Sequence, residues 1–365
     1  MAHTLRIEPL GQSLEVPEDQ TVLEACLRAG LWLPHACCHG LCATCKVRVS
    51  DGEVDHGEAS PFALMDFERE EGLALACCAR LQSDATIEAE IEDDPDAEGI
   101  PVRDVDAVCS LSEAVTPTIR RIRLQLEQPL PFQAGQYVNL EVPDPAGGAP
   151  LRRAFSIANP PHEVTATREI ELHVRRVPGG AATGWLHGQL RPGMGLRLAG
   201  PYGRFFVRGS AHGPAASGGV PLLFIAGGSG LASPRAMVLE LLQRGCPQPI
   251  TLVVGQRTRE ELYDDDLLRD LATRHPHFRY LPVLSHEPEG SGWDGARGWA
   301  HEAAVALHDG DFRGRKAYLC GPPAMVEAAI GALMQGRLFE RDIHTEQFLS
   351  AADAQRVRSP VFRRV

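Results

Sequence analysis

Long apolar runs, a basic surplus and an evenly spaced set of cysteines are all absent from this chain of 365 residues. No apolar run approaches the roughly 18 residues that a membrane helix needs, and residues 1–7 lack the charged and then apolar pattern of a signal peptide. The 36 Lys and Arg residues are outnumbered by 48 Asp and Glu residues, whereas nucleic-acid surfaces are basic. We therefore expect a soluble protein with no membrane segment and no nucleic-acid partner.

Five of the ten cysteines form one dense N-terminal group, whereas Cys109, Cys246 and Cys320 are scattered along the chain. This is unlike the framework of a secreted disulfide protein and indicates a reducing cytoplasm. Four residues separate Cys37 from Cys42 and two separate Cys42 from Cys45, which with the later pair Cys77-Cys78 gives the C-x4-C-x2-C…C spacing of a plant-type [2Fe–2S] site. Thiolates are soft ligands that suit iron, and Gly40 lets the loop turn tightly around a cluster. The pattern predicts an iron–sulfur centre.

Two assignments within this motif have alternatives. Cys38 as the first ligand would leave three residues before Cys42, so Cys37 fits the spacing better. Spacing does not separate Cys77 from Cys78, and we favour Cys77 because the residues before it are similar to the ferredoxin pattern. A four-thiolate zinc site is the alternative centre, but such sites usually carry two C-x2-C pairs and this motif has a single one.

Charge is distributed unevenly along the chain. The first 98 residues hold 6 Lys and Arg against 21 Asp and Glu, a net charge of −15, and the rest of the chain carries +3. A negative electron-transfer module suggests docking on a positive patch of a partner, although solubility alone also favours an acidic surface.

The N-terminal region has the outline of a β-grasp ferredoxin. Apolar and polar residues alternate over 4–8 and 13–16, which predicts a β-hairpin. A helix over 22–29, with Cys26 in the core, and a strand over 46–49 follow. Residues 92–98 hold no apolar side chain larger than alanine and include a proline, so we expect an exposed linker there.

The middle region, 102–207, reads as short strands broken by Gly and Pro, with one helical segment over 184–190. This spacing predicts a small antiparallel β-barrel. The expected strands are 119–126, 136–142, 154–158, 170–176 and 195–199.

The last region alternates buried strands with helices, which predicts a doubly wound parallel sheet. Gly227-Gly228-Ser229-Gly230 forms a tight turn between a strand over 222–226 and a helix that begins near Pro234 and runs to 243. The other expected strands are 250–254, 278–284 and 317–319, and the other expected helices are 260–274, 299–307 and 324–334.

Two small-residue turns in this sheet predict a nucleotide site. A glycine turn between a strand and a helix lets backbone amides and the helix N-terminus meet a phosphate. Gly227–Gly230 alone is a weak signal, since it can be only a turn. It gains weight from Cys320-Gly321-Pro322 at the end of a later strand, because ligands bind at the carboxyl ends of such strands.

The barrel region has its own candidate motif in Arg153-Ala154-Phe155-Ser156, which puts a permanent cation, an aromatic face and a hydroxyl on one strand. Arg153 can pair with a phosphate while alternate side chains face an aromatic ring system. A surface arginine beside a core phenylalanine is the simpler alternative. Gly179-Gly180-Ala181-Ala182-Thr183, before the short helix, offers a second amide-lined phosphate site.

The order of these motifs resembles that of the ferredoxin-NADP reductase superfamily. With the iron–sulfur region placed first, the chain looks like the NADH-dependent reductase components of bacterial aromatic oxygenases, and among them those of multicomponent phenol hydroxylases. The motifs that carry the resemblance are Arg153-x-Phe155-Ser156, Gly179 to Thr183, Gly200-Pro201-Tyr202-Gly203, Gly227 to Gly230, Cys320-Gly321-Pro322 and the stretches 57–66, 131–140 and 334–342.

This resemblance implies a chain of electron transfer. NADH gives two electrons as a hydride and a [2Fe–2S] cluster accepts one at a time, so FAD stands between them. Electrons would pass from NADH to FAD, to the cluster and then to the di-iron hydroxylase of a phenol or aromatic monooxygenase. NADPH is the second choice, because Arg257 follows a sheet strand and can meet a 2′-phosphate.

The resemblance also implies residue roles. The expected catalytic residues are Ser156, which would hydrogen-bond flavin N5, Cys320, beside the nicotinamide, and Glu346, near the flavin. Phe348 stands where plant reductases end in tyrosine, and this chain continues to Val365. The expected FAD-binding residues are Tyr137, Arg153, Phe155, Ser156, Gly179, Gly180, Thr183 and Phe348, the NADH-binding residues Gly227, Gly228, Ser229, Gly230, Cys320, Gly321 and Pro322, and the cluster ligands Cys37, Cys42, Cys45 and Cys77.

Other functions stay open at this point. The chain can serve another aromatic-ring oxygenase or act as a stand-alone NADH diaphorase, and a non-enzymatic iron–sulfur redox sensor is disfavoured by intact motifs in all regions. The expected domains are a ferredoxin domain over 1–95, an acidic linker over 96–101, an FAD-binding barrel over 102–210, an NAD-binding α/β domain over 219–348 and a tail over 349–365.

Overall fold

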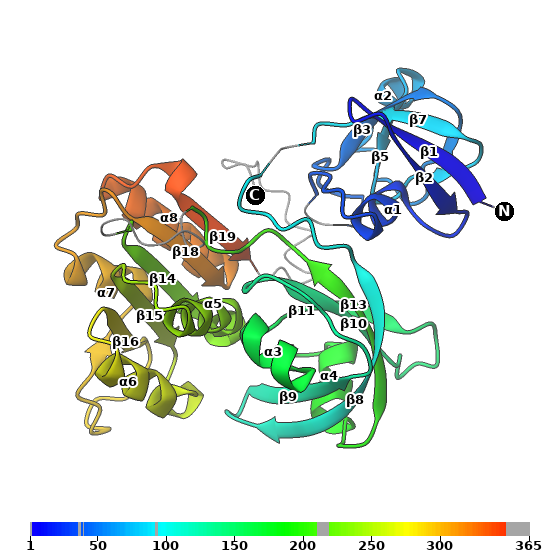
Figure 1. Cartoon of the computed structure of the whole chain (residues 1–365). Coiled ribbons are helices and arrows are strands. Elements are labelled where there is room, and N and C mark those ends of the chain that lie inside the picture. The colour runs from blue at the N-terminus through cyan, green and yellow to red at the C-terminus, as the bar shows by residue number, and fades with distance from the viewer. Residues whose placement is uncertain (1, 36–37, 39, 92–93, 210–218, 348–365) are drawn as a thin grey trace. The chain divides into compact units, whose positions relative to one another are not determined.

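A computed structural model of the chain describes residues 2–35, 38, 40–91, 94–209 and 219–347 (Figure 1). The chain separates into two compact units, the first built on Met1–Arg103 and the second starting at Asp104. None of the helices in the described stretches combines the length and the apolar character of a membrane span.

The first unit is the predicted β-grasp fold, with a five-stranded sheet in the order β2-β1-β7-β3-β5. The N-terminal hairpin is confirmed, because β1 and β2 pair antiparallel with Leu5 opposite Leu14. On its other side β1 lies parallel to β7. The elements of this unit are β1 (Ala2–Glu8), β2 (Gln12–Pro17), α1 (Val22–Arg28), β3 (Lys46–Asp51), β4 (Val54–Asp55), α2 (Asp66–Glu70), β5 (Leu73–Leu75), β6 (Arg80–Leu81) and β7 (Ala85–Glu88).

Helix α1 covers the sheet of the first unit and begins where the sequence predicts. The Thr21 hydroxyl accepts the Glu24 amide while the Glu24 carboxylate accepts the Thr21 amide, which satisfies two donors that a helix start leaves unpaired. Val22, Leu23 and Cys26 are buried, so the expected core position of Cys26 is confirmed.

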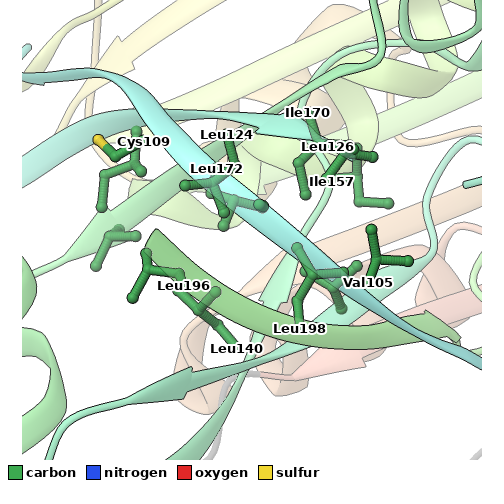
Figure 2. Packing of buried hydrophobic residues seen from close by; sticks show 14 of the residues in the cluster. Val105, Cys109, Leu124, Leu126, Leu140, Ile157, Ile170, Leu172, Leu196 and Leu198 are labelled. Atoms are coloured by element: carbon green, nitrogen blue, oxygen red, sulfur yellow. The ribbon is translucent and has the colours of Figure 1, made fainter. Parts of the chain in front are cut away.

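The second unit begins with the predicted barrel, a curled antiparallel sheet in the order β11-β10-β13-β8-β9-β12. Alternate side chains fill its interior, among them Leu124 and Leu126 of β9, Leu140 of β10 and Leu172 of β12 (Figure 2). The elements are β8 (Arg103–Ala114), β9 (Ile119–Leu126), β10 (Tyr137–Val142), β11 (Leu151–Ser156), α3 (Pro161–Thr167), β12 (Glu169–Arg175), α4 (Ala181–Gly188) and β13 (Gly195–Tyr202).

The barrel differs from expectation in four places. The helix expected over 184–190 is α4, which begins three residues earlier and runs over Ala181–Gly188. The strand expected over 154–158 runs over Leu151–Ser156 instead, with Ile157 forming an isolated bridge to Leu172. Strand β8 and helix α3 were not expected. Buried side chains alternate in β8 at Val105, Ala107 and Cys109, and the pairing register shifts between Cys109 and Leu111.

The remainder of the second unit is the predicted doubly wound sheet, in the order β17-β16-β15-β14-β18-β19 with every pairing parallel. Helices α5 and α6 pack on one face over Phe224 and Leu252, and α7 and α8 pack against one another on the other. The elements are β14 (Leu222–Gly227), η1 (Gly228–Leu231), α5 (Ala232–Gln243), β15 (Ile250–Gln256), η2 (Arg259–Glu261), α6 (Asp265–Arg274), β16 (Phe278–Leu284), β17 (Ala296–Arg297), α7 (Ala300–Leu307), β18 (Lys316–Gly321), α8 (Pro323–Gln335), η3 (Glu340–Asp342) and β19 (Ile343–Gln347).

The expected continuous helix over 260–274 is wrong. A short 3-10 turn, η2, is followed by Tyr263 and Asp264, and α6 begins only at Asp265. Asp264 has a φ of 55°, a left-handed conformation that no α-helix contains. Its carboxylate is held by Arg121 of β9 and Arg235 of α5, so tertiary ion pairs override the local helical tendency.

Candidate functional site

The two turns expected to frame one nucleotide lie side by side at the carboxyl edge of the parallel sheet. Because β14 and β18 are paired, Gly227–Gly230 and Cys320–Pro322 follow neighbouring strands. A Cβ atom on Gly230 would lie 2.5 Å from the carbonyl oxygen of Cys320, and Gly228 has a φ of 59° in the region that favours glycine. This geometry requires glycine at both positions.

The carboxylate of Glu346 on β19 gathers donors from three other elements. Its Oε2 atom accepts the Ser156 hydroxyl of β11 at 3.1 Å and the Ser233 hydroxyl of α5 at 2.8 Å. The Cys320 thiol of β18 donates to the same oxygen over 3.5 Å. The structure thus brings together Ser156, Cys320 and Glu346, as predicted. It adds Ser233, which lies at the start of α5, directly after the glycine turn, and which no sequence pattern indicated.

The electrostatics of this cluster favour neutral, hydrogen-bonding groups. Burial raises the pKa of Glu346, and the hydrogen bonds from Ser233, Ser156 and Cys320 oppose this effect. Burial, reinforced by the neighbouring Glu346, also holds the pKa of Cys320 well above its usual value. The sulfur therefore stays a thiol, which suits contact with a ligand ring and not nucleophilic attack.

On the barrel, β11 carries the expected flavin residues with decreasing exposure along the strand. Arg153 is exposed, Phe155 is half-buried and Ser156 is buried. The guanidinium of Arg153 donates to the carbonyl of Arg152 at 2.7 Å, and no carboxylate within the described stretches pairs with it. Tyr137 of β10 stands opposite Ser156 of β11. The Arg153 cation, which no carboxylate in the described stretches compensates, therefore lies near aromatic side chains. This arrangement suits a nucleotide that carries both a phosphate and a ring system.

The expected phosphate loop on the barrel precedes helix α4. Gly179 has a φ of 70°, and Gly180 is the residue immediately before the first helical turn. The Thr183 hydroxyl accepts the Val177 amide at 3.1 Å and donates to the Gly180 carbonyl at 3.5 Å. Thr183 therefore shapes the loop. A Cβ atom on Gly180 would lie 2.8 Å from the Thr183 hydroxyl, whereas one on Gly179 would have no neighbour within 4 Å.

In the first unit, three of the expected cluster ligands, Cys42, Cys45 and Cys77, are among the described residues, and Cys37 lies outside them. The expected flavin residue Phe348 also lies outside the described residues. Gly40 has a φ of 70°, and a Cβ atom there would lie 2.8 Å from the Cys78 sulfur. The tight turn expected at this glycine is present, and its thiols fit a soft metal such as iron.

The paired cysteines differ in their surroundings. The hydrogen bond from the Cys45 thiol and the amide of Gly40 lower the pKa of Cys77 to about 6, against the effect of burial. Burial, with the neighbouring Cys77, raises the pKa of Cys78 to about 12. The pKa of Cys77 is low because the Cys45 thiol, another expected ligand, keeps its own proton, so the choice of Cys77 continues to depend on the sequence pattern.

Arg175 is a candidate binding residue that sequence reasoning missed. It ends β12, and its Nη1 atom lies 3.2 Å from the position that a Cβ atom on Gly228 would take. A cation from the barrel thus lies against the glycine turn of the parallel sheet. No sequence signal pointed to it, because β12 and this turn meet only in the folded unit.

A buried ionic cluster joins the barrel to the parallel sheet. Glu171 of β12 is bonded by Arg123 and His173 and lies 3.6 Å from Arg235, which also pairs with Asp264 at 2.7 Å. Burial alone would raise the pKa of Glu171, but the bond from His173 and the charge of Arg235 hold it well below its usual value. Glu171, His173 and Asp264 have a metal-ligand spacing, yet the arginines already neutralise the carboxylates.

Comparisons with known proteins match the three regions of the chain that carry these residues. Residues 5–82 match the family model "2Fe-2S iron-sulfur cluster binding domain", residues 107–207 match "Oxidoreductase FAD-binding domain" and residues 224–330 match "Oxidoreductase NAD-binding domain". The fold and the matches define an iron–sulfur flavoprotein that oxidises NADH and binds a [2Fe–2S] cluster, FAD and NADH.

Full-length relatives narrow this class. The chain is 53% identical to the phenol 2-monooxygenase reductase component DmpP of Pseudomonas sp. (strain CF600) and 51% identical to the phenol hydroxylase P5 protein of Acinetobacter pittii (strain PHEA-2), with 100% of both chains covered in each comparison. The crystal structure of the Amycolatopsis cytochrome P450 reductase GcoB is 38% identical, with a TM-score of 0.80 over 95% of this chain and 98% of that one. The chain belongs to the family of reductase components of multicomponent phenol hydroxylases.

Proposed function

We propose that this protein takes electrons from NADH and delivers them to the hydroxylase component of a phenol hydroxylase. The observation that carries the proposal is the set of hydrogen bonds to Glu346, which draws on the barrel through Ser156 and on the parallel sheet through Cys320. A site built by both layers is where a flavin and a nicotinamide can meet. Phenol itself would bind to the hydroxylase partner.

Bound FAD supplies the step between a two-electron donor and a one-electron acceptor, the [2Fe–2S] cluster. The residues on the barrel fit this group. Arg153 would pair with its pyrophosphate, because its guanidinium has no carboxylate partner within the described stretches. Gly179, Gly180 and Thr183 would border the phosphates, because a glycine loop before a helix suits an anion. The residues proposed to lie along its ring are Tyr137, Phe155, Ser156 and Phe348.

The parallel sheet would hold NADH. Gly228, Ser229 and Gly230 present their backbone to the pyrophosphate, and Arg175 adds a positive charge beside the turn. Cys320, a protonated thiol by the raised pKa, would lie against the nicotinamide. Through three hydrogen bonds, Glu346 fixes the orientation of the Cys320 thiol and of the hydroxyls of Ser156 and Ser233. Gly227, Gly321 and Pro322 would complete the two turns.

In the first unit, Cys37, Cys42, Cys45 and Cys77 would hold the cluster. The close packing of the Cys78 sulfur against Gly40 supports Cys77 as the fourth ligand. We place the protein in the cytoplasm, where reducing conditions keep such thiols available. The matched models fall inside the proposed domains 1–95, 102–210 and 219–348, and they leave 96–101 as the proposed linker and 349–365 as the proposed tail.

Anaerobic titration with NADH, followed by absorbance, tests the electron path. We expect the flavin and cluster bands to bleach together, and reconstitution with a phenol hydroxylase oxygenase component to restore phenol hydroxylation. Bleaching of the flavin without the cluster would contradict the path. Full reduction without transfer to the hydroxylase would instead favour a diaphorase or the reductase of another oxygenase.

A further inference from the structure

Tyr263 connects the glycine turn of the parallel sheet to the barrel. It is 5% exposed and follows η2, where the expected helix is interrupted. Its hydroxyl donates to the carbonyl oxygen of Gly228 at 3.2 Å. Its ring meets the His173 imidazole of β12 edge-on, with 5.0 Å between centroids and 90° between planes. One side chain therefore contacts both the turn and a barrel strand.

The contact with Gly228 sets the direction of a backbone amide. In a trans peptide the carbonyl of one residue and the N–H of the next point in opposite directions. A Gly228 carbonyl held by Tyr263 therefore turns the Ser229 N–H away from Tyr263. Gly228 opens η1 with a φ of 59°, a conformation that favours glycine, and the Tyr263 hydroxyl adds a side-chain restraint to this peptide. The Gln256 amide supplies a longer second contact, 3.4 Å, to the same carbonyl.

The surroundings of Tyr263 keep it rigid. The adjacent residue, Asp264, is paired with Arg235 at 2.7 Å and also with Arg121. His173 is held from its other side by Glu171, 3.0 Å from its Nε2 atom. Burial keeps the pKa of Tyr263 well above its usual value, so the hydroxyl remains a donor.

We propose that Tyr263 is a positioning residue for NADH: through the Gly228 carbonyl it orients the turn that receives the pyrophosphate, and through His173 it ties that turn to the flavin barrel. The inference rests on the proposed placement of NADH at Gly228–Gly230. This inference also gives a function to the non-helical residues between η2 and α6, because Tyr263 is one of them. Without the hydroxyl the turn samples other peptide orientations, and the fraction competent to bind falls.

The test is Tyr263→Phe in the FAD-loaded and cluster-loaded protein, because this change keeps the ring against His173 and removes only the donor. Tyr280→Phe is the matched control, since the Tyr280 hydroxyl donates to Asp265 at 3.0 Å and not to the turn. We expect the Kd for NAD⁺, measured by calorimetry, and the KM for NADH to rise about three- to tenfold in Tyr263→Phe, the equivalent of one net hydrogen bond. The melting temperature should fall by a similar small amount in the two variants, because each loses one hydrogen bond. The FAD content and kcat at saturating NADH should stay unchanged, and the control should bind NAD⁺ as the wild type does.

A donor without phosphate separates positioning from general damage. Flavin reduction by 1-benzyl-1,4-dihydronicotinamide should proceed at the same rate in Tyr263→Phe and in the wild type. An unchanged Kd for NAD⁺, equal losses with both donors, or an equal effect of Tyr280→Phe would overturn the inference. Failure of the proposed function would appear differently, as a wild-type protein whose flavin is not reduced by NADH.

Discussion

The two units build their candidate sites in different ways. In the first unit, the described cluster cysteines lie on one loop, Cys42 to Cys45, and on one turn at Cys77, and the loop takes its shape from left-handed residues such as Gly40. In the second, Ser156 and Glu346 are 190 residues apart in sequence, and Arg121 and Asp264 are 143 apart. The first site depends on local backbone shape and the second on the packing of a whole unit. Damage to one site should therefore leave the other intact.

The largest expected effect is the loss of the cluster in Cys42→Ser. Serine is a poor ligand for iron, so electron delivery to a hydroxylase should disappear. NADH should still reduce FAD, and dichlorophenolindophenol reduction should persist, because the flavin residues lie in the other unit. Absorbance and the dye assay measure the two outcomes.

Cys38→Ser is the matched control for this change. It lies beside the loop and outside the ligand set favoured by spacing, so its cluster should remain. Loss of dye reduction in a folded, FAD-loaded Cys42→Ser protein would show that the two sites are not independent.

The next effect comes from the buried ionic cluster of the second unit. Glu171→Gln leaves Arg235 with less compensation in a buried site, and removal of one such partner costs about 3 to 5 kcal/mol. Thermal unfolding of the second unit should shift to lower temperature, while the cluster absorbance of the first unit stays unchanged. Asp311→Asn, at an exposed pair with Arg313, should have no measurable effect.

The pH dependence of stability provides an independent check on Glu171. Its pKa is lowered in the folded protein from an ordinary value of 4.5. Its contribution is therefore present above that value and is lost as the pH falls below it. The difference in unfolding free energy between wild type and Glu171→Gln should shrink as the pH is lowered below this value, and a constant difference would contradict the ionic explanation.

A smaller effect is expected for Arg153→Ala. The variant should lose FAD during dialysis because a phosphate loses a charge-assisted hydrogen bond, which is worth about 1.5 to 3 kcal/mol. Arg152→Ala removes the neighbouring arginine, which is bonded to Glu141 at 3.0 Å, and should retain FAD. Equal FAD content in the two variants would return Arg153 to the role of a surface residue.

The smallest effect concerns docking and the contrast in charge. The first 98 residues carry −15, so electron transfer to the hydroxylase should slow severalfold as salt rises, because screening acts within about 8 to 10 Å. Reduction of FAD by NADH should change less. Stopped-flow measurements at several salt concentrations resolve the two steps.

Charge reversals test the same idea at low salt. Reversal of Asp51, Glu53, Asp55 or Glu58 should reproduce part of the slowing, whereas Glu127→Lys in the barrel should not. Insensitivity to salt and to these reversals would make the acidity a solubility feature and would leave docking to apolar residues such as Leu41.

Local periodicity predicted much of the fold. The hairpin of β1 and β2, helix α1, and strands β9 and β16 lie where the sequence pattern put them, because their alternation or capping residues are local. The break before α6 was not predictable, because Asp264 leaves the helical conformation for ion pairs with residues of β9 and α5. Strand β19 was equally hidden, since its pairing partner β18 lies earlier in the chain across α8.

The candidate sites divide in the same way. Cysteine spacing is a local signal, so the cluster motif was visible in the sequence. Ser233 gains its role only when Glu346, 113 residues later, reaches its hydroxyl, and Arg175 only when β12 approaches Gly228. Ser156, Cys320 and Glu346 were predicted through resemblance to a family, because spacing alone gives no reason to connect them.

The position of Glu346 also has a consequence for synthesis. Domains generally fold as units and from the N-terminus as the chain leaves the ribosome, so the ferredoxin unit can form while later residues are still being added. The oxygen that gathers Ser156, Ser233 and Cys320 belongs to β19, the last described strand. A nascent chain that ends before β19 contains Ser156, Ser233 and Cys320 but lacks the carboxylate that accepts hydrogen bonds from all three. The site around Glu346 can therefore form only after the ribosome has synthesised β19.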